Sequence, residues 1–200
     1  MNLAACFIVI IINQGLKKYG GDLAIGAFGI VNRLVFIVVM IVMGLNQGMQ
    51  PIAGYNFGAK LYGRVNKVLR LTIIYATAVT TFGFLVGMLV PDLVVGIFTS
   101  DAELTELSVT GLRITVMFFP IIGFQMVTSN FFQSIGMAGK AIFLSLTRQM
   151  LILLPCLLIL PQFFGVAGVW YSMPVSDLLA SLIALVMLVC QFRKFRTSPL

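Results

Sequence analysis

Residues 23–53 read LAIGAFGIVNRLVFIVVMIVMGLNQGMQPIA, and this run decides the class of fold. Its single charged residue is Arg33. A helix crosses the hydrocarbon core of a bilayer with about 20 apolar residues, so the run is long enough to cross with a tilt or to project past the bilayer. A barrel strand crosses in roughly 11 residues and alternates apolar with polar side chains, which this run does not do. We therefore expect a transmembrane helix.

Five more apolar runs accompany it. The six expected helices cover approximately residues 1–16, 23–53, 66–90, 105–133, 140–160 and 166–192. The apolar part of the first, 3–12, rises only about 15 Å as a helix before Asn13, Gln14 and Gly15. For this reason we expect Met1 to be an internal methionine of a longer protein. The predicted fold class is an all-α membrane protein, a polytopic bundle of about six transmembrane helices.

The composition supports this class and argues against several functions. Apolar residues make up 60% of the chain and charged residues 10%, whereas soluble domains carry about 25% charged residues. The net charge of +7 resides in short loops between apolar runs and not on one face with exposed aromatics, so we expect no nucleic-acid partner. The chain has no histidine, and its three cysteines lie inside apolar runs without metal-type spacing. We expect no enzyme activity, no metal site and no cofactor.

The charged loops predict the orientation of the bundle. Basic residues gather in three segments: Lys60, Arg64 and Lys67; Lys140; and Arg193, Lys194 and Arg196. Six crossings place these segments on one side, which the positive-inside rule assigns to the cytoplasm. Every acidic residue except Asp177 falls on the opposite side, and Lys17 and Lys18 break the pattern. We expect a multi-pass protein of the inner (plasma) membrane with a cytoplasmic C-terminus.

Four ionisable residues lie within apolar runs: Arg33, Arg113, Arg148 and Asp177. Charges at bilayer depth cost about 2.5–3.5 kcal/mol and usually face a protein interior or a wet cavity. Arg148 is near enough to one surface to extend its head group toward it. Asp177 has two interpretations: a cation-sensitive carboxylate lining a transport cavity, or a structural ion pair with Arg33 or Arg113.

Polar and small residues mark helix faces inside the bundle. Gln125, Ser129 and Gln133 recur every four residues and so share a face, with Thr128 and Asn130 beside them. This face is expected to point into the bundle or a cavity, and either lining a cavity or joining helices would account for it. Glycine pairs at spacing four, such as Gly44 and Gly48, predict close helix packing. Pro120 and Pro155 are expected to bend the helices that contain them.

Residues 44–60, GLNQGMQPIAGYNFGAK, strongly resemble a segment of the multidrug and toxic compound extrusion (MATE) family. Residues 132–136 continuing to 148–149, and residues 165–170 continuing to Asp177, resemble the same family in order and spacing. The resemblance spans nearly the whole chain. It implies one lobe of a MATE-like transporter, the C-terminal six-helix lobe, in which residues 44–60 close the second helix.

The resemblance also implies the function: export of organic, often cationic, compounds by antiport with protons or sodium. Two six-helix lobes surround a central cavity that opens alternately to either side, in the manner of rocking repeats. The motif would form the end of a helix that tilts and packs differently in each state. Its gating or packing residues are Asn46, Gln47, Gln50, Pro51, Gly54, Tyr55, Asn56 and Gly58.

The chain also departs from the family pattern. A complete member is about twice as long, so the expected partners are a missing N-terminal lobe or a second copy, together with membrane lipid and small organic substrates. The family's coupling acid usually lies in the absent lobe, and the apolar part of the fourth run, 107–133, has no carboxylate. Two alternatives remain open: a lipid-linked oligosaccharide flippase of the same superfamily, and a truncated remnant that does not transport.

Overall fold

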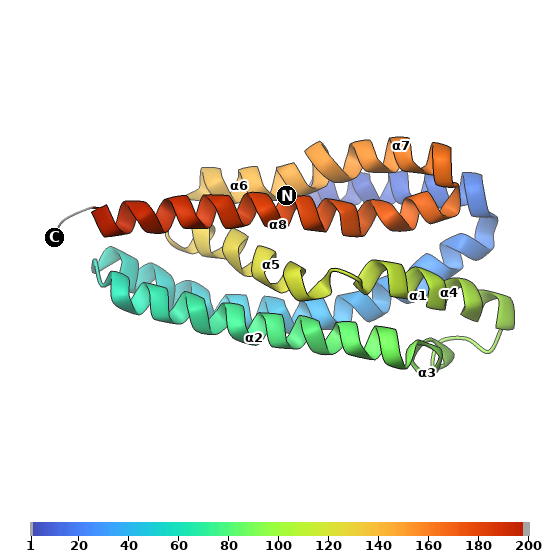
Figure 1. The fold of residues 1–200 in the computed structure, drawn as a ribbon, viewed down its shortest axis with the longest axis horizontal. Helices are drawn as coiled ribbons and strands as arrows, with labels where there is room; N and C mark the ends of the chain where they lie inside the picture. The colour runs from blue at the N-terminus through green and yellow to red at the C-terminus, as the bar shows by residue number, and fades with distance from the viewer. Residues whose placement is uncertain (1, 198–200) are drawn as a thin grey trace.

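The computed structural model describes the backbone of residues 2–197 and the side chains of residues 6–193. Over residues 2–197 the regular structure is entirely helical, as predicted (Figure 1). The elements are α1 (Asn2–Gly58), α2 (Tyr62–Leu89), α3 (Pro91–Gly96), α4 (Ala102–Val116), α5 (Phe119–Ser134), α6 (Ala138–Leu146), the π-helix η1 (Thr147–Leu153), α7 (Leu154–Phe164) and α8 (Val166–Thr197). The side chains of Lys194 and Arg196 lie outside the described ones.

Helix α1 consists of two limbs that meet at Gly21. This glycine has φ 67° and ψ −162°, a conformation that costs a side-chain-bearing residue free energy. We call residues 2–20 the short limb and residues 22–58 the long limb; Figure 1 shows them running in opposite directions. The expectation that the first helix ends near residue 16 is wrong, because the helix continues to Gly20. Leu16 is fully buried there, so packing extends the helix past its polar residues.

Two of the predicted helices are interrupted near their prolines. The fourth is divided into α4 and α5, which meet at an angle of 55° just before Pro120. The fifth is continuous from Ala138 to Phe164 but adopts π-helical geometry over Thr147–Leu153. Pro155 follows directly and has no N–H to donate, while the N–H of Leu154 donates to the carbonyl of Gln149. Both interruptions therefore lie next to residues that cannot continue a regular α-helical hydrogen-bond ladder.

The described chain contains helices of the length that crossing a membrane requires. Four helices are long and apolar enough to cross a membrane, and five when α4 and α5 count as one bent span. One of these helices, α1, contains both limbs. The bundle has a basic end, where α1 turns into α2 at Lys60, and an acidic end, where α4 begins after Asp101.

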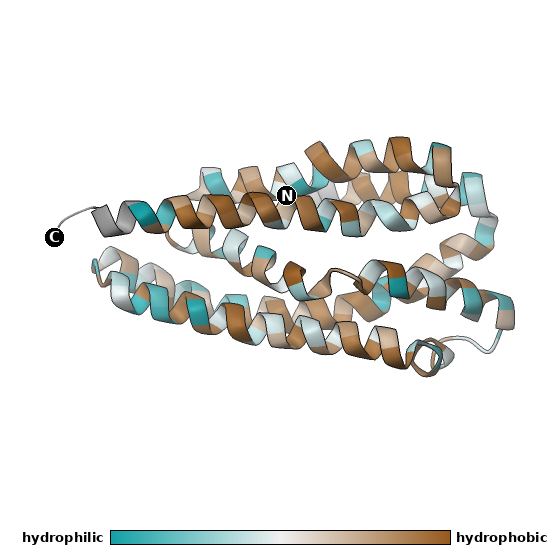
Figure 2. Ribbon diagram, in the orientation of Figure 1, coloured by the Kyte–Doolittle hydropathy of each residue, from teal (hydrophilic) through white to brown (hydrophobic). Residues whose placement is uncertain are grey.

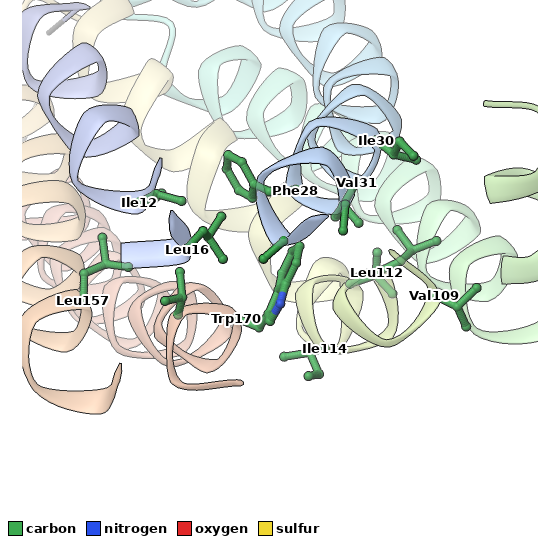
Figure 3. Packing of buried hydrophobic residues seen from close by; sticks show 14 of the residues in the cluster. Ile12, Leu16, Phe28, Ile30, Val31, Val109, Leu112, Ile114, Leu157 and Trp170 are labelled. Carbon is green, nitrogen blue, oxygen red and sulfur yellow. The ribbon is translucent and has the colours of Figure 1, made fainter. Parts of the chain in front are cut away.

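The core divides into two apolar clusters stacked along the bundle. The cluster nearer the acidic end centres on Trp170 of α8, which is 2% exposed. Figure 3 shows its indole between Phe28 of the long limb and residues of α4, and the Phe28 and Trp170 rings lie 5.9 Å apart. A Cβ on Gly111 would lie 2.6 Å from the indole, so this glycine makes room for the largest side chain of the core. The second cluster contains Phe131 and Phe132 of α5.

The backbone of Leu160 approaches Gly168 closely, so adding one methyl group at Gly168 should lower the stability of the bundle. A Cβ there would lie 2.4 Å from the carbonyl oxygen of Leu160, and this backbone atom cannot move like a flexible side chain. We expect Gly168→Ala to destabilise the bundle by about 1–3 kcal/mol, as overpacking does, measured by thermal unfolding in detergent. Gly29→Ala is the matched control, since its Cβ would meet nothing within 4 Å. Equal melting temperatures for the two variants would contradict this packing.

Candidate functional site

The long limb of α1 and helix α5 run side by side in the same direction. The side-chain amide of Gln50 donates to the side-chain oxygen of Asn130 at 3.4 Å. One turn further on, a Cβ on Gly54 would lie 3.0 Å from the carbonyl oxygen of Ser134. The sequence predicted these residues as parts of two separate features, the motif and the polar face of the fourth helix. The structure joins the two features toward the basic end of the bundle.

The motif residues of the long limb face two ways. Asn46 is 2% exposed, and Asn56, at 8%, donates its amide to the carbonyl of Ile52 at 2.8 Å. Neither amide atom of Asn46 has a partner among the described residues. Gln47, Pro51, Gly58 and Tyr55 are exposed, Tyr55 to 78%. The motif thus supplies one face that packs inside this chain and a second face that this chain leaves uncovered.

The polar face predicted on the fourth helix enters the bundle only in part. Gln125 is 4% exposed, as expected of an inward face. Ser129 is partly buried, and its hydroxyl donates to the carbonyl of Ala141 on α6 at 3.5 Å. Gln133 is exposed and so lies outside the interior of this bundle, while its neighbour Phe132 is buried. Residues four apart advance by about 40° around a helix, so the polar face turns gradually outward from Gln125 to Gln133.

Asp177 pairs with Arg148, and this corrects the expected partner. The Nε of Arg148 donates to Oδ1 of Asp177 at 2.7 Å. The Asp177 side chain is 6% exposed and that of Arg148 32%. Arg33 and Arg113 are exposed, so both predicted partners lie on outward faces while Asp177 points inward. This salt bridge joins η1 to α8.

The position of Arg148 follows from the inward face of α6. Arg148 lies seven residues after Ala141 and four after Leu144, both of which are buried, and residues at this spacing share a helix face. Arg148 is also the second residue of η1, and single-turn π segments often occur at functional sites. The sequence contained a signal for the interruption in Pro155.

Two hollows lie outside the ion pair. One is an apolar groove of about 240 Å³ between the long limb, α2, α4 and α5, and its lining includes Leu34, Ile41, Phe82 and Leu112. Since Leu34 and Leu112 line the same groove, their neighbours Arg33 and Arg113 lie at one level of the bundle. The second hollow lies at the acidic end, where Glu103 and Glu106 face the start of α8. Both carboxylates are exposed.

These features define a polytopic helical membrane lobe, in which polar side chains lie between packed helices and one face is left open. The chain belongs to the MATE family of transporters, because the MatE family model matches residues 1–159. It is 28% identical to the multidrug export protein MepA of Staphylococcus aureus over 92% of its own length. The MepA of Staphylococcus saprophyticus is 24% identical over 88% of the chain.

Solved structures agree with this assignment. The MATE multidrug transporter DinF-BH superposes with a TM-score of 0.84 at 37% identity over 98% of this chain. An outward-facing multidrug resistance MATE transporter superposes with a TM-score of 0.90 at 18% identity, which shows the shared fold. The chain spans 40% of the length of MepA and 44% of the DinF-BH chain.

The ion pair predicts an asymmetric response to its two single substitutions. Arg148→Gln leaves a buried carboxylate without its cation, and breaking a buried pair costs about 3–5 kcal/mol; we expect the lower end because Arg148 is partly exposed. Asp177→Asn should cost less, since the remaining guanidinium can extend toward water. Unfolding in detergent micelles measures both.

The double variant Arg148→Gln, Asp177→Asn should recover at least about 1 kcal/mol relative to the sum of the single effects, because contacting residues are not additive. Arg33→Gln serves as a control that removes an exposed arginine. Strict additivity in the double variant would show that the pair contributes nothing to the fold.

Proposed function

We propose that this chain is one lobe of a secondary active multidrug exporter and works together with a second six-helix lobe. The exported compounds are organic cations or other xenobiotics, exchanged for protons or sodium. Family membership and the similarity to MepA support this proposal. The chain's share of its relatives' length, 40–44%, supports the requirement for a second lobe, and the alternative partner is a second copy of the chain.

The open face of the long limb is the observation that carries the proposal. Along it, Gly44 and Gly48 would place a Cβ in open space, and Gln47 between them is exposed. Small residues at spacing four let another helix approach closely in a membrane, and a lipid-facing amide is unfavourable. Exposed apolar side chains outside the groove continue this face, namely Met40 and Ile52. A face of this composition fits a packed helix better than it fits lipid.

The exposed arginines support the same arrangement. Arg33 and Arg113 are exposed at one level inside apolar segments. Charges at such depth normally face a cavity or another protein, so we place both toward the central cavity between the lobes. Asn130, Gln125, Ser129 and Gln133 belong to the adjacent wall.

Asp177 has a structural role in this proposal. It is the one buried carboxylate of the described helices, and Arg148 already pairs with it. We therefore place the coupling carboxylate in the other lobe. We further propose that the protein resides in the plasma membrane with the basic end in the cytoplasm, since positively charged loops remain there.

Ethidium accumulation in an efflux-deficient host tests the proposal. The chain alone, verified in the membrane, should leave ethidium uptake unchanged, because it supplies one wall of the cavity. A chimera that places it after the N-terminal lobe of MepA should lower accumulation several-fold. Efflux by the chain alone would contradict the need for a different lobe, and an inserted chimera without efflux would favour the truncated remnant.

Substitutions at Gly44 and Gly48, on the open face of the long limb, should impair transport without changing the stability of the isolated chain. Gly44→Leu and Gly48→Leu each place a side chain into open space, so the isolated chain should unfold at an unchanged temperature. In the chimera, the same substitutions should reduce ethidium efflux at least tenfold by keeping the lobes apart. Gly139→Leu, at an exposed glycine near the start of α6, should have no effect on either. Normal efflux by both variants would show that this face does not contact a lobe.

A further inference from the structure

One face of α2 begins with three cations. Arg64, Lys67 and Arg70 are all exposed and recur every three residues over about 9 Å of helix. The buried residues of α2 form the opposite face: Val65, Leu69, Thr72, Ala76, Thr80 and Gly87. We call Arg64, Lys67 and Arg70 the α2 ridge. Helix α2 contains no acidic residue.

Among the described residues, no acidic side chain neutralises the α2 ridge. Five of the six acidic residues, Asp22, Asp92, Asp101, Glu103 and Glu106, lie in or beside the connections at the acidic end, and Asp177 pairs with Arg148. Lys140, also near the basic end, is held by a hydrogen bond to Gln191 and lies over the ring of Phe132. The α2 ridge thus presents three adjacent positive charges for which the described chain supplies no anion.

An apolar stripe continues from the α2 ridge along the same helix face. Exposed hydrophobic side chains follow at Leu71, Ile74, Tyr75, Phe82, Leu85 and Leu89. Figure 2 shows the change along α2, from hydrophilic residues at its N-terminal end, on the left, to hydrophobic residues further on. A helix face that is cationic at one end and apolar beyond it matches the polarity of one membrane leaflet, from head group to hydrocarbon.

The stripe leads to the apolar groove. Phe82 is 69% exposed and also lines the groove, together with Val79 of α2 and Ile41 of the long limb. Arg70 and Phe82 are separated by about 18 Å of helix. One leaflet is about 15 Å deep, half of the hydrocarbon thickness. A lipid chain whose head group lies at the α2 ridge therefore ends near the groove.

We propose that α2 binds an anionic phospholipid of the leaflet at the basic end. The phosphate lies among Arg64, Lys67 and Arg70, and an acyl chain follows Leu71 and Tyr75 toward the groove at Phe82. A non-helical acidic segment would satisfy the cations but not the apolar stripe below them, because its backbone would be left without hydrogen-bond partners in hydrocarbon. The lipid satisfies both parts of the face. This binding does not depend on transport.

Native mass spectrometry of the full chain in detergent tests the proposal. Phosphatidylglycerol and phosphatidylcholine with identical acyl chains are the probes, and the wild-type chain should retain phosphatidylglycerol preferentially. In Lys67→Gln, Arg70→Gln the affinity should fall about tenfold to thirtyfold, since each basic residue near an anionic lipid contributes a factor of about five. The preference should also weaken with added salt, as expected of exposed charges.

The matched control is Lys17→Gln, Lys18→Gln, which removes the same charge from exposed lysines elsewhere and should keep the preference. Circular dichroism verifies that both double variants retain their helix content. Equal retention of the two lipids by the wild-type chain would overturn the proposal, and so would equal losses in the two double variants. Glycerol phosphate at matched ionic strength should not displace the lipid; displacement would show a site for free phosphate and likewise overturn it.

Discussion

The constraint on which this structure depends is the absence of water to bond the backbone inside a bilayer. Every N–H and C=O in hydrocarbon needs a partner within the protein, so crossing segments are helical and turns lie at the ends. The positive-φ residues follow this rule. Gly21 and Gly165 separate helices at the acidic end, while Lys60 and Gly136 do so at the basic end. Inside the described bundle, the helices are interrupted only beside Pro120 and Pro155, where packing against neighbouring helices compensates for the disturbed backbone hydrogen bonds.

The same constraint governs the charged side chains. Asp177 can be buried because Arg148 donates to it at 2.7 Å, and Arg148 reaches α8 because it continues the buried face of Ala141 and Leu144. Arg33 and Arg113 have no such partner among the described side chains and remain exposed. The lobe therefore satisfies its charges on the side of α7 and α8 but leaves charges and glycines open elsewhere. This division is what we expect of half a transporter whose cavity lies between two lobes.

The α2 ridge is a second surface for which the described chain supplies no partner. The long limb presents glycines and an amide, which suit another helix, whereas α2 presents cations above an apolar stripe, which suit a lipid. Since α2 packs along the long limb and α5, a bound lipid would contact the helix beside the gating motif. Lipid composition could then influence the lobe through α2 without any contact with the transported compound.

The amino-acid sequence by itself determined the class of fold, because hydrophobic length and loop charge are local quantities. Residues 23–53 predicted a crossing helix, Pro120 predicted a bend, and residues 44–60 predicted the family. The sequence could not determine rotations between helices. Whether Asp177 meets Arg33, Arg113 or Arg148, and whether Gln133 points inward, depends on the angular phase of several helices packed together. The tertiary structure decided both, since the packing of η1 against α8 brings Arg148 to Asp177 and the rotation of α5 leaves Gln133 exposed.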